Sequence, residues 1–321
     1  MISIILICVL GLLAVVTHLG VVAVERRYPA SGQAIKIEGA NINLVDIGPR
    51  DGAEPPLLLI HGASSNLDAM RRPLGDLLAR YHRVLLVDRP GHGWSERDRL
   101  EDSTPAIQAR MLEDVLQRLG VDSVILVVHS WSGALGTRMA LDFPHRVAGL
   151  VMLAPVAYPW RGGVGRYNEA VATPLIGPLL ANTITLPLGL LLAKAAARGV
   201  FLPQPMPDDF LDQTATPLLL RPREFAANAR DLATLKQAVR EQAPRYGEIK
   251  IPVTIIAGDA DRTVFTDIHS RPFARAVPQT RLIVRPDLGH MVQNAVPELV
   301  IEEVDRMIAG MRLANALPTG P

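Results

Sequence analysis

Cysteine and net charge are what this sequence has least of. Its 321 residues contain one cysteine, Cys8, which excludes an intrachain disulfide and a metal site built from several thiolates. The 33 Lys and Arg residues balance 32 Asp and Glu residues to a net charge of +1, so no nucleic-acid partner is predicted. A hydrophobic share of 49% excludes a disordered chain and can fill the core of one large α/β domain or two smaller ones.

The first segment lacks acidic and basic side chains other than one histidine. The uncharged stretch Ile2 to Val24 would be a helix of about 34 Å, against a hydrocarbon core of about 30 Å. We therefore predict an N-terminal transmembrane anchor over residues 1–24, inserted through residues 2–24, and a linker over residues 25–34.

A cleaved signal peptide is the alternative for this segment. Cleavage after Ala23 is compatible with the sequence, but no Lys or Arg precedes the apolar run, and the run is longer than in a typical signal peptide. Arg26 and Arg27 follow the span, and this distribution of charge favours a membrane protein whose remaining chain lies in the cytoplasm.

A serine follows the most regular buried strand of the chain. Val124 to Val128 is a continuous apolar run, typical of a strand in a parallel sheet, and helical spacing resumes after Gly133. Ser130 stands between the two, where its hydroxyl would project from the edge of the sheet near backbone N–H groups at the start of a helix. An ordinary serine N-cap is the alternative interpretation of the same corner.

This strand, sharp turn and helix resemble the nucleophile elbow of the α/β-hydrolase superfamily, usually written Gly-x-Ser-x-Gly. The sequence departs from that pattern twice, with Val128 at the first glycine and Ser132 at the second. We assign the nucleophile to Ser130 rather than Ser132, because the strand ends at Val128 and one residue suffices to complete the turn. We expect the Gly133 or Ala134 region to make room for the valine side chain.

Two further segments carry the resemblance. Leu57 to Ile60 is a buried strand followed by His61-Gly62, and the family then places an oxyanion-hole donor at the backbone N–H of Ala63, with Trp131 as the second donor. Residues 84–95 are another strand with a glycine-flanked turn. The resemblance makes this turn architectural, with Asp88 and Ser95 as hydrogen bonders and His92 as a structural residue.

The acid and the base of the resemblance come late in the chain. The run from Gly258 to Val264 matches the family pattern Gly-x-x-Asp-x-x-Val and makes Asp261 the acid, with Asp259 as the alternative. His290 follows the last strand as part of a Gly-His pair and is implied to be the base. The order serine, acid, histidine is that of the α/β-hydrolases.

The family resemblance implies a mostly parallel, doubly wound α/β sheet with a helical cap inserted between two parts of the core. We expect the hydrolase core at residues 35–154 and 247–312, the cap at 155–246 and a tail at 313–321. Val171 to Ala193 carries no charge and is long enough for a second span, but its prolines favour short kinked helices.

The predicted function is hydrolysis of carboxylic esters of hydrophobic substrates through a triad of Ser130, His290 and Asp261 and an acyl-enzyme, with no cofactor or metal. Serine at the elbow disfavours epoxide opening and dehalogenation, whose enzymes in this superfamily carry an aspartate there. Hydrolysis of a C–C bond and cofactor-free haloperoxidase chemistry are alternatives for the same triad. A membrane-tethered binding protein without activity is the alternative of another class.

Overall fold

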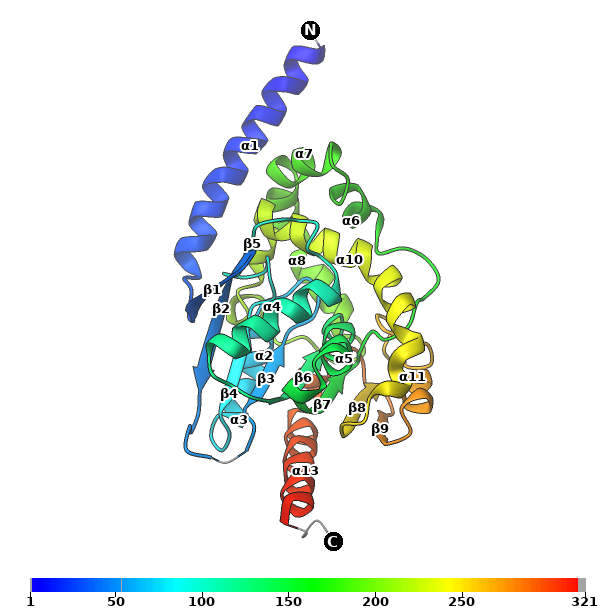
Figure 1. Cartoon of the computed structure of the whole chain (residues 1–321). Coiled ribbons are helices and arrows are strands. Elements are labelled where there is room, and N and C mark those ends of the chain that lie inside the picture. Colours follow the sequence, from blue (N-terminus) through cyan, green and yellow to red (C-terminus); the bar gives the residue numbers. More distant parts are fainter. Residues whose placement is uncertain (1, 53, 317–321) are drawn as a thin grey trace.

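A central sheet dominates the structure, a computed structural model that describes residues 2–52 and 54–316 (Figure 1). Within these residues the sheet has nine strands in the order β1-β2-β4-β3-β6-β7-β8-β9, with β5 paired to β2. Strands β1 and β2 run antiparallel to their neighbours, and the strands from β4 to β9 along this order are parallel to one another. The strands are β1 (Gln33–Ile37), β2 (Ala40–Ile47), β3 (Leu57–Ile60), β4 (Val84–Val87), β5 (Glu96–Arg97), β6 (Val124–His129), β7 (Val147–Leu153), β8 (Val253–Gly258) and β9 (Thr280–Arg285).

Helices cover both faces of this sheet, which explains why its central strands are continuously apolar. Alternate residues of one strand join different cores: Leu58 packs with α4 (Pro105–Arg118) and α5 (Ser132–Asp142), while Leu57 packs with α13 (Pro297–Ala316) on the other face. The fold class predicted from the sequence is therefore confirmed.

Short helices complete the core between the strands. Residues 68–78 form α2 (Asp68–Met70), a π-helical turn (Arg71–Gly75) and α3 (Asp76–Leu78), and a 3-10 turn (Pro144–Arg146) precedes β7. The helices α11 (Ser270–Ala276) and α12 (Val292–Ala295) flank β9. Helix α13 continues to Ala316, so residues 313–316 of the predicted tail are helical, and residues 317–321 lie outside the described residues.

Residues 155–246 contribute no strand and are mostly helical. They contain α6 (Arg166–Val171), α7 (Ile176–Thr183), α8 (Thr185–Phe201), α9 (Phe210–Gln213), a 3-10 turn (Thr216–Leu220), α10 (Pro222–Gln242) and the start of another 3-10 turn (Ala243–Glu248). The uncharged stretch is divided as its prolines indicated, because α7 and α8 meet at an angle of 70°.

The N-terminal helix α1 (Ile2–Arg27) projects from the body of the molecule, and the two termini lie at opposite ends (Figure 1). It is long and apolar enough to cross a membrane, and only 6% of its apolar window is buried. Its second half packs on α7 and α8. There, the Thr17 hydroxyl donates to the Thr183 carbonyl over 3.0 Å, and Glu25 pairs with Arg221 at 2.9 Å.

Candidate active site

Ser130 occupies a strained corner between β6 and α5. Its φ of 55° lies in the left-handed region, which a residue with a side chain adopts only when its surroundings enforce it. Its backbone N–H donates to the Leu153 carbonyl of the neighbouring strand, and its own carbonyl accepts from the N–H groups of Gly133 and Val156. These bonds hold the corner in place, as expected for a nucleophile elbow.

Three residues predicted from separate segments of the sequence meet at this corner. Nε2 of His290 lies 3.0 Å from Oγ of Ser130, and Nδ1 of His290 lies 2.8 Å from Oδ2 of Asp261. Because a carboxylate only accepts, the histidine proton belongs on Nδ1, which leaves Nε2 free to accept from the serine hydroxyl. All three side chains are buried or nearly so.

The neighbouring aspartate has a different task. Oδ1 of Asp259 accepts from the backbone N–H of Asp287 over 2.8 Å, and thereby closes the loop that precedes the histidine. Asp261 is held by the N–H groups of Thr263 and Val264, which donate to its Oδ1 over 2.8 and 2.9 Å. The geometry therefore favours Asp261 over Asp259 as the partner of His290.

The two departures from the glycine pattern have local explanations. A Cβ added at Gly136 would lie 3.1 Å from one Val128 methyl group, so this glycine makes room for the valine. The sequence predicts that room in the Gly133 or Ala134 region, but Gly133 lies against Pro155 instead. The Ser132 hydroxyl donates to the carbonyl of His61 and ties the elbow to the end of β3.

Gly62 brings the loop after β3 close to the serine. A Cβ at this position would lie 3.0 Å from Cβ of Ser130, tighter than nearly all real contacts. The Gly62 carbonyl accepts from Nδ1 of His61 over 2.8 Å and from Nη2 of Arg89 over 3.2 Å. A peptide unit is planar and its C=O and N–H point in opposite directions, so these bonds fix the direction of the Ala63 N–H.

The two predicted oxyanion donors belong to segments that adjoin Ser130. Ala63 follows Gly62, and Trp131 begins the turn into α5, whose N-terminus favours negative charge. Among the described residues, neither backbone N–H has a hydrogen-bond acceptor. Both residues line the same cavity as Ser130 and His290.

A buried ion-pair network that the sequence analysis missed lies behind this site. Arg89, with no exposed surface, pairs with Asp231 of α10 at 2.6 Å, and Arg97 pairs with the same carboxylate at 2.5 Å. The Arg89 guanidinium also lies 4.0 Å from the ring centre of Trp131, whose indole N–H donates to the Asp231 carbonyl. An arginine two residues after the end of β4 was the available signal.

Two further histidines of the site are held neutral. Burial, reinforced by the nearby His290, lowers the pKa of His129 to about 3, and its Nε2 donates to the His290 carbonyl. Burial also lowers the pKa of His269 to about 4, and its Nδ1 accepts from the N–H groups of Ala157 and Tyr158. Neither residue therefore competes with His290 as a base near neutral pH.

The turn after β4 is architectural, as predicted. Asp88 accepts from the N–H groups of Leu67 and Trp94 and from the Asn43 amide, while burial raises its pKa to about 7. The Ser95 hydroxyl donates to the Asp88 carbonyl. His92 is fully buried and contacts Arg89, which is consistent with the structural role that the resemblance implies.

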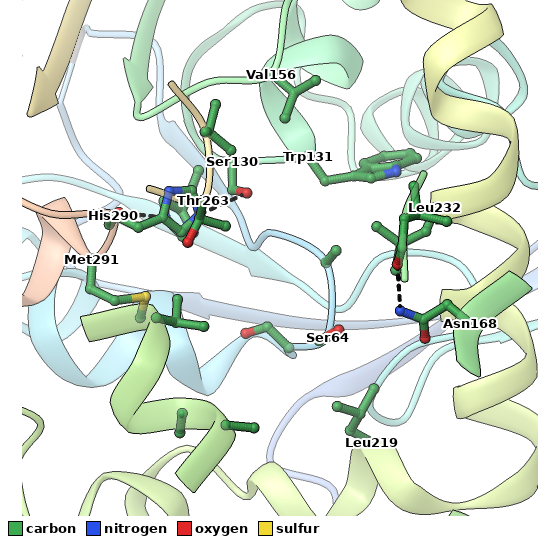
Figure 2. Close-up of a pocket in the computed structure, with 18 of the residues that line it drawn as sticks. Ser64, Ser130, Trp131, Val156, Asn168, Leu219, Leu232, Thr263, His290 and Met291 are labelled. Carbon is green, nitrogen blue, oxygen red and sulfur yellow. Dashed lines mark hydrogen bonds between the residues drawn. The ribbon is translucent and has the colours of Figure 1, made fainter. Parts of the chain in front are cut away.

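A cavity of about 1370 Å³ lies over the candidate triad. Figure 2 shows Ser130 and His290 on one side of it, with Trp131, Leu232 and Leu219 across the open space. Most of the lining is apolar, and α8, α10 and the 3-10 turn between α9 and α10 contribute to it. Among the described lining residues, Arg161 is the single Lys or Arg. No group of three or more potential metal ligands occurs in the described parts of the chain.

The fold and this site define an α/β-hydrolase. The sequence profile of the alpha/beta hydrolase fold matches residues 55–294, so the chain belongs to this family.

Relatives in the family carry different names. The 2-hydroxy-6-oxononadienedioate/2-hydroxy-6-oxononatrienedioate hydrolase of Klebsiella pneumoniae is 28% identical over 78% of this chain and 85% of its own. The magnesium-chelatase 30 kDa subunit of Rhodobacter capsulatus is 30% identical over 79% of this chain and 86% of its own. A solved membrane phospholipase A, described as a bacterial virulence factor, shares the fold with a TM-score of 0.69, 20% identity and 97% coverage of both chains.

Proposed function

We propose that this protein is a serine hydrolase that cleaves carboxylic esters of hydrophobic substrates. One observation carries the proposal: the hydrogen-bonded series Ser130, His290 and Asp261 borders a large apolar cavity. The series has the geometry that nucleophilic catalysis needs, and the apolar wall of the cavity suits an acyl or alcohol group that avoids water.

The reaction would proceed through an acyl-enzyme. Oγ of Ser130 attacks the ester carbonyl carbon while Nε2 of His290 takes the hydroxyl proton, and the N–H groups of Ala63 and Trp131 bind the oxyanion. The histidine then returns that proton to the departing alcohol. Water, deprotonated by the same nitrogen, releases the acid and regenerates the serine. Asp261 keeps the ring oriented and stabilises the imidazolium.

Hydrolysis of a C–C bond is the second candidate, and the names of the relatives favour it. The Klebsiella relative is named for a dioate, and a Burkholderia cepacia relative is named 2-hydroxy-6-oxo-6-phenylhexa-2,4-dienoate hydrolase. A small dicarboxylate would need cationic partners on both ends, and Arg161 is the one Lys or Arg among the described lining residues. The cavity therefore disfavours the dioate, whereas the phenyl dienoate, with one carboxylate and one apolar end, competes with a hydrophobic ester for the same space.

We also propose how the chain is organised around this site. Residues 155–246 form a cap inserted between the core parts 35–154 and 247–312, and α1 is an uncleaved membrane anchor with the hydrolase domain on the cytoplasmic side. The anchor is supported by the length and exposure of α1, and the side of the membrane by Arg26 and Arg27, which follow the apolar run.

A substrate panel tests the proposed reaction. The full-length protein in detergent should hydrolyse p-nitrophenyl esters, faster with acyl chains of eight or more carbons than with acetate, and Ser130→Ala should abolish the difference from buffer. A 2-hydroxy-6-oxo-6-phenylhexa-2,4-dienoate assay runs beside it. Turnover of the dienoate without turnover of any ester would replace the first proposal with the second.

A further inference from the structure

The anchor helix and the helical segment above the site are not independent parts. Besides the bond from Thr17 to the Thr183 carbonyl, Gly20 lies so close to Leu186 that an added Cβ would come within 2.6 Å of a leucine methyl group. Thr183 ends α7, and Leu186 lies in the first turn of α8. The corner where α7 meets α8 is therefore fastened to α1.

The position of these contacts along α1 sets the depth of the corner. The first charged residue after the apolar stretch is Glu25, whose ion pair with Arg221 marks the polar end of the helix. Gly20 and Thr17 lie five and eight residues before it, which is about 8 Å and about 12 Å further into the bilayer for a helix along the membrane normal. A corner fastened to these two residues enters the hydrocarbon region with the anchor.

The outer surface of this corner suits that environment. We call residues 175–193 the cap corner; they contain no charged side chain, and the next charge along α8 is Lys194. Leu175 is 89% exposed and Leu191 is 80% exposed. Further exposed apolar side chains are Ile176, Leu179 and Leu190. They continue the exposed apolar surface of α1, and an apolar surface of this kind marks a membrane or protein contact.

Helix α8 has a second apolar face, which lines the cavity. All four leucines at 188 and 190–192 are exposed, but only Leu188 and Leu192 belong to the cavity lining, so Leu190 and Leu191 expose another side of the helix. One helix thus separates the outer surface of the cap corner from the space over Ser130. Figure 1 shows α7 at the end of the molecule along which α1 extends.

We propose that the cap corner lies in the same leaflet as the second half of α1, and that the enzyme takes a lipid-soluble ester laterally from the bilayer past α8. The bilayer is the occupant of this surface because the corner is fastened to a helix of membrane-spanning length and repeats its uncharged character. The inference rests on the proposed anchor. It adds the surface that contacts lipid and the route by which the substrate arrives.

Depth measurement by fluorescence quenching tests the placement in the full-length protein. The native thiol Cys8 reports on the anchor; in a Cys8→Ser background, Leu179→Cys and Leu191→Cys report on the corner, and Tyr81→Cys serves as the control. Tyr81 is 77% exposed and follows α3, far from α7 (Figure 1). Each thiol is labelled with an environment-sensitive dye, and the labelled protein is reconstituted in vesicles of phosphatidylcholine with brominated acyl chains.

Quenching at positions 8, 179 and 191 but not at 81 is the expected result. Quenching at position 8 without quenching at 179 and 191 overturns the inference and leaves the anchor intact. Absence of quenching at position 8 contradicts the anchor and, with it, the inference. None of these outcomes depends on the reaction that the enzyme catalyses.

Kinetics test the route. Leu179→Glu and Leu191→Glu place a charge on the outer surface, away from the residues that line the cavity, and should lower turnover of a long-chain ester presented in vesicles at least about tenfold. Turnover of a short soluble ester should stay at the wild-type level, and Tyr81→Glu should change neither. Equal turnover of the vesicle-bound ester by all variants overturns the lateral route.

Discussion

The core side and the cap side of the cavity are built in opposite ways. On the core side the reactive groups stand in hydrogen bonds: Asp261 accepts from two backbone N–H groups and from His290, and the Gly62 carbonyl accepts from two side chains. On the cap side, α8 and α10 present mainly leucine and alanine to the same space. Directional bonds fix positions, whereas apolar walls exclude water and adapt to shape.

Because of this difference, we expect the core side of the cavity to control the chemical step and the cap side to control substrate preference. Changes on the core side should act on kcat, because they displace groups that meet the transition state. Changes on the cap side should act on which substrate is used, because an apolar contact discriminates by size and surface. The network of Arg89 and Asp231 joins the two sides, so it should act on stability.

The largest expected effect is on the core side. Ser130→Ala and His290→Ala should each lower ester turnover by roughly 10⁴- to 10⁶-fold, and the double variant should lose little more, because the residues act as a unit. Steady-state kinetics on a p-nitrophenyl ester measure this. Independent, multiplying losses would contradict a shared mechanism.

The second-largest effect is expected in the ion-pair network that joins the core side to the cap side. Arg89→Met leaves Asp231 buried with one partner fewer and should lower the free energy of unfolding by about 3–5 kcal/mol. The matched control Arg138→Met breaks a partly exposed pair with Asp142 and should cost about 1 kcal/mol or less. Chemical denaturation in detergent measures the free energy of unfolding of both variants. Equal losses would contradict the claim that the buried network stabilises the fold more than a partly exposed ion pair does.

On the cap side, filling the cavity should change selectivity. Ala196 lines the cavity, so Ala196→Phe should lower kcat/KM for a long-chain ester by roughly tenfold or more and leave a short ester unaffected. Ala195 is exposed on the same helix and is not part of the lining. Ala195→Phe is therefore the control, and a similar loss in both variants would show that α8 does not select substrates as proposed.

Acid should destabilise the core side. Burial lowers the pKa of His129 to about 3 and of His269 to about 4, and those of His61 and His92 are also lowered. Between about pH 4 and the unfolded value of about 6.5, the unfolded chain binds more protons than the native chain, so stability rises with pH there and falls on acidification. The raised pKa of Asp88, about 7, opposes this in part.

Removing one of these histidines tests the sign. His269→Gln should reduce the slope of unfolding free energy against pH by up to about 1.4 kcal/mol per pH unit between pH 4 and 6.5. His145→Gln on an exposed turn should leave the slope unchanged. An unchanged slope in the first variant would mean that His269 titrates alike in both states.

The smallest effect is expected at the elbow itself. Val128→Gly restores the usual glycine and should keep activity within about tenfold of wild type, because Gly136 already makes room for the valine. Complete loss of turnover in the same esterase assay would reveal a role for the valine side chain beyond packing.

The sequence predicted the core far better than the cap. Strands β3, β4, β6 and β8 are buried apolar runs, and a residue that follows such a run reaches the edge of the sheet. This pattern placed Ser130 there, and the family resemblance chose Asp261 rather than Asp259 after β8. Their mutual distances depend on strand order, which no local pattern contains. The pairing of Arg89 with Asp231 spans 142 residues, so an arginine near the end of β4 was visible in the sequence but its partner was not.

In the cap, prolines predicted the break between α7 and α8, but they did not predict that the corner formed there contacts α1. The contact of Thr17 with Thr183 joins two uncharged stretches that looked alike in sequence, one free over most of its surface and one folded over the cavity. Hydropathy measures only composition, so the different surroundings of the two helices emerge only when the chain is folded.

Covalent labelling of the full-length protein with a fluorophosphonate probe tests the central claim most directly. A binding protein of the same fold without activity is the competing account, and it predicts no adduct. A nucleophilic serine predicts a stoichiometric adduct on the peptide that contains Ser130, found by mass spectrometry, and none in Ser130→Ala or after heat denaturation. An unlabelled native protein, or an adduct at Ser132 instead, would contradict the assignment.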